Sequence, residues 1–518
     1  MPALLAFICM MRKQTSSHLK SSSLRPSMAW LHTWAGILAG WILYAMFLTG
    51  SVSYFREELT QWMQPEIPAL AATPDALRTT QLGMQMLQEI APDNAQWTIE
   101  LPGARGNTAY AMWQAGDGFE RIAYDPLSGK QYTPRDTAGG EFFYYFHFSL
   151  HYFPRTLGRW ITGFCAMLML IGIISGLIIH KKIFADFFTF RWGKGQRSWL
   201  DAHNAFSVLG LPFHLMITYT GLVMLMFMYM PWGRDAALTT PQERAALTAE
   251  MRARLTPDTR SGQPATLTPI AHMFAEADKH WGPGNVERAI ISNPGDTTAR
   301  VMLVRGNAGR ISVSPHYMLF NGQNGNILQI KDQASAAVTS WGVMYGLHLG
   351  RYADTVTRWL YFIISLAGTA MVATGLILWT VKRRQRLNQA ETAAPGLKLV
   401  ERMNIACIAG LSIAMTAYLW GNRLLPLEMA QRSAWEIHLF FIVWGITLLH
   451  ACCRPVRRAW LEQLWLATAL LALLPVLDKL TNPHAMFVMF DISALTLAVA
   501  HGVLAIKMHR TRNRSAKV

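Results

Sequence analysis

Long apolar runs alternate along the chain with polar segments of very different lengths. A stretch of about 20 apolar residues is long enough to cross the hydrocarbon core of a bilayer as a helix. Eight runs meet this measure, near residues 30–55, 158–180, 204–230, 358–381, 402–420, 435–453, 460–477 and 485–507. The seventh is the weakest, because Glu462 and Asp478 flank it. The pattern predicts an all-α polytopic membrane protein with about eight transmembrane helices.

Two long polar segments, residues 56–146 and 231–346, interrupt the apolar runs. Each is large enough to form a small domain. Each contains a helix-like stretch and, near its end, a strand–turn–strand pattern in which apolar and aromatic residues flank turn residues. The helix-like stretches are 76–91 and 266–281, and the strand–turn–strand patterns are 121–133 and 316–330. We therefore expect two small α+β domains that are alike.

The first four apolar runs repeat in pairs. Aligning the first run with the third places His32 on His203, and aligning the second with the fourth places Gly176 on Gly375. Such fixed self-similarity predicts a tandem repeat of span, outer domain and span. Both copies run the same way through the membrane, so the natural symmetry is a pseudo-two-fold axis along the membrane normal.

The repeat occupies residues 30–180 and 203–381, and the C-terminal part of the chain has a different pattern. Residues 402–507 contain four apolar runs with short loops, and they show no similar repeat. We interpret them as an appended C-terminal four-helix membrane module.

Charge indicates how the chain crosses the membrane. Only 15% of the residues are charged, against about 25% in soluble proteins, and the net charge is +16. The basic residues gather in short segments at the ends of spans, which the positive-inside rule places in the cytoplasm. The predicted cytoplasmic segments are 1–29, 181–203, 382–401 and 508–518. Both termini are then cytoplasmic, and both long polar segments lie outside.

The same charge pattern argues against a nucleic-acid partner, because the basic residues form no continuous patch. The first apolar run exceeds the usual 7–15 residues of a signal-peptide core, so we expect a retained span. None of the five cysteines lies in the two outer segments, which must fold without disulfides. The chain has no Cys-x-x-Cys pair that would support an iron–sulfur site or a covalent c-type haem.

Two pairs of histidines occupy equivalent positions in the two repeat copies. An ionisable side chain in a span is costly and needs a partner, and imidazole is a common axial ligand of haem iron. Under the two-fold axis, His32 and His203 lie near the inner face, and His151 and His348 lie near the outer face. The pairs predict two bis-histidine haems, on the order of 20 Å apart or less. Such haems would carry electrons across the membrane.

Further histidines break the symmetry and leave other pairings open. His180 ends the second run, so either His180 with His203 or His32 with His180 could form the inner pair. His147 lies one helical turn before His151 and could replace it.

Other polar residues near the spans extend the candidate site. His214 follows His203 by about three turns, which predicts one shared helix face, and it could pair with an outer histidine or bond a haem propionate. Arg159 and Arg358 occupy equivalent positions and either contact propionates or anchor the helix ends. A weaker set without repeat partners is His438, His450, His484 and His501.

A set of motifs carries a resemblance to a known family. They are "LHTWAG" with "LTGSVSYFREE", "ISGLIIHKK", "DAHNAF" with "TYTGLV", and "LHLGRY" with "ATGLILW". As a set they resemble the PepSY-associated transmembrane helix proteins, over residues 30 to about 385. The turns "YDPLSGK" and "FNGQNGNIL" are similar to the signature of PepSY domains.

Members of this family are often called iron-regulated membrane proteins, and some are dihaem ferric-siderophore reductases of the bacterial inner membrane. The resemblance implies a four-helix core with two b-type haems and two periplasmic PepSY domains. Residues beyond about 400 lie outside it.

The histidine pairs and the resemblance together favour an oxidoreductase. Electrons would enter from a cytoplasmic or membrane donor and leave to a periplasmic acceptor, a ferric siderophore. A haem-free siderophore or solute transporter is an alternative, in which the histidines and Asp491 serve proton coupling. A scaffold whose PepSY domains restrain a periplasmic protease is another. Transporters favour polar groups near the midplane, whereas most of these histidines lie near the faces.

Overall fold

The computed structural model describes residues 24–116, 118–180, 187, 190–191, 193–387, 393–482 and 487–515. Most of the predicted N-terminal tail, much of the predicted loop 181–203 and His484 lie outside the described residues. The chain divides into two compact units. The helical unit comprises residues 1–63, 136–222 and 357–518, and the sheet unit comprises residues 64–135 and 223–356.

Seven helices of the described chain are long and apolar enough to cross a membrane. They are α2 (Leu24–Ser53), α6 (Arg155–Ile179), α15 (Thr355–Arg384), α16 (Pro395–Leu424), α17 (Arg432–Cys453), α18 (Val456–Thr481) and α19 (Val488–Ser515). They correspond to seven of the eight predicted runs. The weakest run, near residues 460–477, forms α18 and meets the same criteria.

The predicted span 204–230 is not one continuous helix, and whether it crosses the membrane stays a prediction. Helix α8 (Gln196–Leu209) and helix α9 (Leu211–Met224) meet at Gly210 with a bend of 69°. Pro212 is the second residue of α9, where the missing N–H of proline is tolerated but the ring conflicts with a preceding helical turn. The pair counts as an eighth span only if both halves belong to one crossing.

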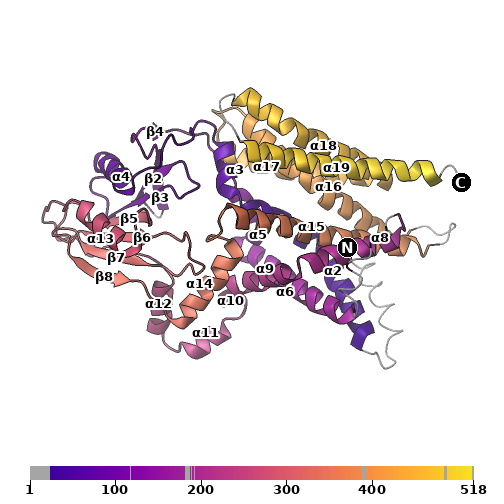
Figure 1. Cartoon of the computed structure of the whole chain (residues 1–518), viewed down its shortest axis with the longest axis horizontal. Coiled ribbons are helices and arrows are strands. Elements are labelled where there is room, and N and C mark those ends of the chain that lie inside the picture. The colour runs from indigo at the N-terminus through magenta and orange to yellow at the C-terminus, as the bar shows by residue number, and fades with distance from the viewer. Residues whose placement is uncertain are drawn as a thin grey trace. The chain divides into compact units, whose positions relative to one another are not determined.

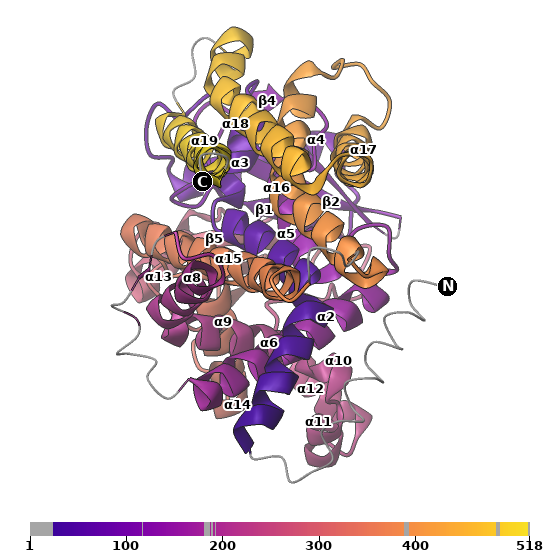
Figure 2. The ribbon, with the colours of Figure 1, turned by 90° about the vertical axis from the view of Figure 1, so that its right-hand side faces the viewer.

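The C-terminal module packs onto the first repeat copy within the helical unit. Helix α16 contacts α17, α18 and α2, and α18 contacts α19; Figures 1 and 2 show α16, α18 and α19 side by side. The Trp41 indole N–H of α2 donates to Asn404 Oδ1 at 2.9 Å, and the Tyr44 hydroxyl donates to the Ile408 carbonyl at 3.1 Å. Two shorter helices of this unit are α3 (Arg56–Met63) and α5 (Glu141–Ser149).

The sheet unit is built from one antiparallel sheet of eight strands, in the order β4-β3-β2-β1-β5-β6-β7-β8. The strands are β1 (Gln96–Glu100), β2 (Ala109–Ala115), β3 (Gly118–Tyr124), β4 (Gln131–Tyr132), β5 (Val286–Ser292), β6 (Arg300–Arg305), β7 (Tyr317–Asn321) and β8 (Ile327–Lys331). The helices of this unit are α4 (Ala76–Ile90), α10 (Met226–Tyr229), α11 (Trp232–Ala237), α12 (Pro241–Glu250), α13 (Ala271–Trp281) and α14 (Ala336–Leu349).

Both predicted strand–turn–strand patterns are confirmed as hairpins, β3–β4 and β7–β8. The two helix-like stretches form α4 and α13. The two polar segments nevertheless share a single sheet, because β1 of the first pairs with β5 of the second, with Trp97 opposite Ile291. They therefore form one structural unit where the sequence predicted two separate domains.

The two faces of the sheet differ. On one face, alternate strand residues such as Trp97, Ile99 and Ile291 pack with α4 and α13 into the largest apolar core of the unit. The period of two along each strand sends the intervening residues to the opposite face. That second face carries a separate small apolar cluster that includes Ile290 and Met302, and polar residues of β1 such as Gln96 and Thr98.

Candidate functional site

His32 of α2 is held against α6. Its Nδ1 lies 2.9 Å from the Gly172 carbonyl oxygen and 3.3 Å from the Ser175 hydroxyl. A Cβ added to Gly176, one turn beyond Gly172, would lie 3.3 Å from His32 Cε1. A glycine at this position therefore lets the imidazole lie close to the backbone of α6.

His203 of α8 is held against α15 in the same way. Its Nδ1 lies 2.8 Å from the Met371 carbonyl oxygen. A Cβ added to Gly375 would lie 3.1 Å from His203 Cε1. Each imidazole thus bonds a carbonyl of the facing helix and covers the glycine four residues later. The alignment that superposes Gly176 on Gly375 also superposes Gly172 on Met371.

The two imidazoles lie next to each other. The ring centres of His32 and His203 are 6.1 Å apart, and the ring planes are inclined at 73°. A carbonyl oxygen only accepts hydrogen bonds, so Nδ1 of each ring carries the proton. The lone pair of each ring is therefore on Nε2, as in metal-ligating histidines whose other nitrogen bonds a carbonyl.

This geometry fits one iron atom held between the two rings. A ligating imidazole nitrogen lies about 2 Å from its metal, so two rings on opposite sides of one metal have centres about 6 Å apart. The described residues contain no group of three or more His, Cys, Asp and Glu side chains that could hold a bare metal ion. Haem iron needs only axial ligands from the protein, and the donor set of two imidazoles meets that need.

Two other histidines repeat the same contact further along the bundle. His147 Nδ1 lies 2.6 Å from the Met46 carbonyl oxygen of α2, and a Cβ on Gly50 would lie 2.7 Å from its ring. Met46 is 14 residues beyond His32, which is about 21 Å along a helix. His147 therefore lies at a second level of the helical unit.

His214 lies at this second level too. Its ring is 6.1 Å from Phe47, the residue after Met46. Its Nε2 is 3.4 Å from the Ile364 carbonyl oxygen, and a Cβ on Gly368 would lie 3.0 Å from it. The side chain is only 1% exposed, and its Nδ1 has no hydrogen-bond partner among the described residues.

Comparison with known families places most of the chain in one of them. A family model described as the PepSY-associated TM region matches residues 29–382. The chain belongs to this family. No curated protein matches the chain. Together with its seven apolar helices, the family identifies a multi-pass membrane protein whose bilayer contacts come from these helices.

The PepSY-associated match covers both copies of the predicted repeat and stops within α15, before the C-terminal module. His32, His147, His203 and His214 all lie inside it. Helices α16 to α19 lie beyond the matched residues.

The predicted outer pair in this PepSY-associated protein has a different setting. His151 follows α5, where its ring stacks on Phe441 at 5.6 Å and lies 4.4 Å from Tyr152. Leu150 and Tyr152 on either side of it have positive φ angles, which are rare and strained for such residues. His348 lies near the end of α14 in the sheet unit. The pairing of His151 with His348 therefore stays a prediction.

The other predicted site residues lie at helix ends. His180 follows the last residue of α6, and its backbone N–H donates to the Gly176 carbonyl at 3.1 Å. Arg159 Nε donates to Ser149 Oγ at 3.4 Å, and its guanidinium lies over the Phe148 ring. Arg358 is buried in the first turns of α15.

Two features of the site differ from the sequence-based prediction. The bend at Gly210 separates the helices of His203 and His214, so the predicted shared face of one straight span is wrong. The glycines and carbonyls that hold the imidazoles were missed as site residues. Their signal was present, because Gly176 and Gly375 align in the repeat.

Proposed function

We propose that this protein is an inner-membrane electron-transfer protein that binds haem b and reduces a ferric siderophore outside the cytoplasm. The observation that carries the proposal is the His32–His203 pair. Both rings belong to the helical unit, their centres are 6.1 Å apart, and Nδ1 of each is bonded to a carbonyl of a neighbouring helix. Such a pair suits one haem iron.

Contacts within the chain support the proposed ligand chemistry at this pair. The carbonyls of Gly172 and Met371 keep the proton on Nδ1, which leaves the lone pair of Nε2 in each ring for a metal. Gly176 and Gly375 provide the close approach of helix and ring. When bound, haem supplies reversible one-electron transfer, and the protein supplies ligands, burial and distance.

A second haem would lie at the level of Met46 and Phe47. His147 and His214 are our candidates for its ligands, because each repeats the contact with a carbonyl and a glycine. The unpartnered, buried Nδ1 of His214 supports this assignment. Unlike the predicted His151–His348 pair, this pair breaks the repeat symmetry. Comparing His214→Ala with His348→Ala distinguishes the two assignments.

The substrate is inferred from the family resemblance together with iron chemistry. One electron reduces Fe(III) to Fe(II), a less charged ion that hard oxygen ligands hold more weakly. The siderophore would then release its iron. The sequence has no G-x-G-x-x-G motif following a strand, so an electron donor in the cytoplasm or the membrane must deliver electrons.

Haem content of variants tests the proposal. His32→Ala should lose about half of the haem of the purified protein, because one of two bis-histidine sites loses a ligand. His501→Ala is a matched control, since His501 of α19 bonds the Leu497 carbonyl and Ser412 instead of facing another histidine. Full haem in His32→Ala would show that His32 and His203 do not form a haem site.

One observation favours a transporter as a second candidate. Broken helices are typical of transporter binding sites, and α8 and α9 form such a break at Gly210. A transporter would need no haem. Siderophore uptake into proteoliposomes by haem-free protein would support this candidate against the reductase.

A further inference from the structure

The two halves of the second face of the sheet have different surroundings. A segment that we call the strap, residues 251–258, comes after α12 and lies across β5, β6 and β7. Leu255 of the strap packs with Ile290, Met302 and Leu319 in a small apolar cluster. On the other half, Gln96, Thr98 and Met112 of β1 and β2 face a cavity.

The strap is firmly attached at its end. Asp258 forms an ion pair with Arg300 of β6 at 2.5 Å, and the Asn293 side-chain amide donates to the Asp258 carbonyl at 2.8 Å. These two contacts hold the strap in place on the sheet. The cavity lies beside the edge of the strap, where β1 and β5 meet.

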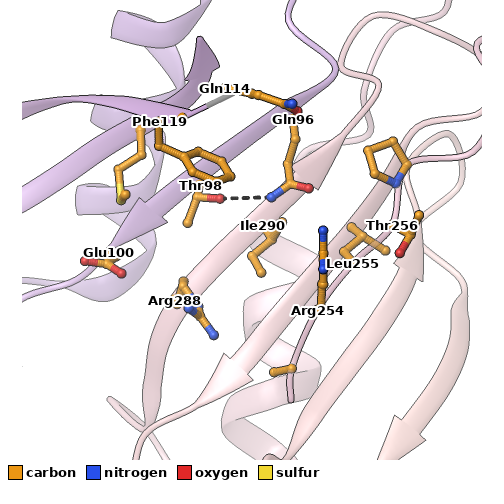
Figure 3. Close-up of a pocket in the computed structure, with 14 residues that line it drawn as sticks. Gln96, Thr98, Glu100, Gln114, Phe119, Arg254, Leu255, Thr256, Arg288 and Ile290 are labelled. Atoms are coloured by element: carbon orange, nitrogen blue, oxygen red, sulfur yellow. Dashed lines mark hydrogen bonds between the residues drawn. The ribbon is translucent and has the colours of Figure 1, made fainter. Parts of the chain in front are cut away.

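The cavity has a volume of about 430 Å³, within the range of small-molecule pockets. Figure 3 shows that its side chains come from neighbouring strands and from the strap. Residues Gln96, Thr98 and Glu100 of β1 provide neutral and acidic oxygens, and Gln96 and Thr98 contact each other at 3.4 Å. Ile290 and Leu255 add apolar surface.

Two guanidinium groups and the carboxylate of Glu100 give the pocket a charge that is positive overall. Arg288 lies on β5 opposite Glu100 of β1, and its Nε is buried with no hydrogen-bond partner among the described residues. Arg254 extends from the strap and is exposed. A buried donor without an acceptor is costly, and guanidinium groups match the two oxygens of a carboxylate. An oxyanion in the pocket would provide the missing acceptor.

We propose that this pocket binds a small organic anion that carries carboxylate groups. The two arginines would hold the carboxylates, and the glutamine and threonine side chains would bond hydroxyl or carbonyl groups. The site lies wholly within the sheet unit and goes beyond the proposed electron transfer, since it does not depend on haem. Citrate and its ferric complex share this chemistry, so they are suitable probes for the metal-free and the metal-bound form.

Binding to the full-length protein in phosphatidylcholine nanodiscs tests the site. Equilibrium dialysis with radiolabelled citrate and with ferric citrate should give saturable binding of at least one of them. Arg288→Gln should weaken it by at least about tenfold, because a charged hydrogen-bond donor is lost. Arg254→Gln should weaken it less, because Arg254 is more exposed and hydration competes with the ligand.

Arg78→Gln is the matched control, because Arg78 is exposed on α4, which covers the other face of the sheet. It should bind like the unmodified protein. Unchanged binding in both Arg288→Gln and Arg254→Gln would overturn the proposal, as would no saturable binding of either probe at millimolar concentration. Inorganic phosphate that displaces citrate at equal concentration would overturn the carboxylate assignment. Arg254→Gln keeps the test decisive if Arg288→Gln does not fold.

Discussion

The repeat helices and the C-terminal module both bury polar side chains, but they satisfy them differently. In the module, buried charges face opposite charges of the chain itself: Arg423 pairs with Asp478 at 2.7 Å and Arg432 pairs with Glu436, all fully buried. In the repeat helices, buried imidazoles are bonded to backbone carbonyls through one nitrogen. In the first arrangement each charge has a counter-charge within the chain, whereas in the second Nε2 of each ring is left for the ligand that we propose.

The ion pairs of the module also join distant segments of the helical unit. Arg423 donates to the Trp62 carbonyl at the end of α3 at 2.7 Å. Glu436 accepts from the Thr137 hydroxyl at 2.6 Å, and Arg432 donates to the Asp136 carbonyl at 3.1 Å. In each contact, the residue of the module lies beyond the family match and its partner lies within the match. The comparison therefore assigns a structural role to the module's charges and supports the ligand-binding role that we propose for the imidazoles.

The largest expected effect comes from breaking a buried ion pair. Arg423→Met should destabilise the protein by about 3–5 kcal/mol, because Asp478 would remain buried without its counter-charge. Thermal unfolding of the purified protein in detergent measures the loss. Arg454→Met is the control, since Arg454 forms a more exposed pair with Glu462 and should have a much smaller effect. Equal losses in the two variants would contradict the structural role of the buried pair.

An intermediate effect is expected from closing the space beside an imidazole. Gly375→Val would place a side chain 3.1 Å from His203 Cε1 and should remove about half of the haem, if His203 is an axial ligand. Gly445→Val in α17 is a control away from the imidazoles, because a Cβ there has no neighbour within 4 Å. Pyridine hemochrome assays measure haem in both. Equal haem in both variants would show that the close contact of Gly375 with His203 does not affect haem binding.

The smallest expected effect concerns a histidine outside the membrane-spanning helices, which extends the comparison to an imidazole in the sheet unit. Burial, followed by the nearby Arg310, lowers the pKa of His316 to about 4, against about 6.5 unperturbed. Between pH 4 and 6.5 the unfolded state then binds more protons, so stability rises with pH across this window and falls as pH drops through it. The other charged groups near His316 are Arg305, Lys331 and Asp332.

His316→Gln should flatten this pH dependence in the sheet unit. Hydrogen exchange of peptides from β7, corrected for the intrinsic pH dependence of exchange, measures it. His272→Gln on α13 is a control for histidine loss at an exposed site. The same slope in His316→Gln and the unmodified protein would show that His316 does not titrate in this window.

Local sequence patterns predicted many elements of this fold. Apolar runs predicted the seven long helices, and turn residues predicted both hairpins. The joined sheet could not be predicted, because the β1–β5 pairing connects residues such as Ile99 and Ala289, and no local pattern encodes so distant a partner. The bend at Gly210 had a signal in the nearby Pro212, but a long apolar run concealed it.

The candidate site was predictable where symmetry guided it. The repeat placed His32 beside His203, and the structure brings these two rings together. Symmetry could not reveal His147 and His214 as residues of one level, because they occupy different positions in the two copies. The buried ion pairs were equally hidden, since Arg423 and Asp478 lie at the ends of helices whose packing no sequence pattern specifies.

The central claim is that the paired imidazoles hold haem. The most direct measurement is the dithionite-reduced minus oxidised visible spectrum of the purified protein, with haem quantified by pyridine hemochrome after expression with ample haem. We predict a sharp bis-histidine b-type spectrum and about two haems per chain. Protein that folds under these conditions without haem would contradict the claim and favour the transporter.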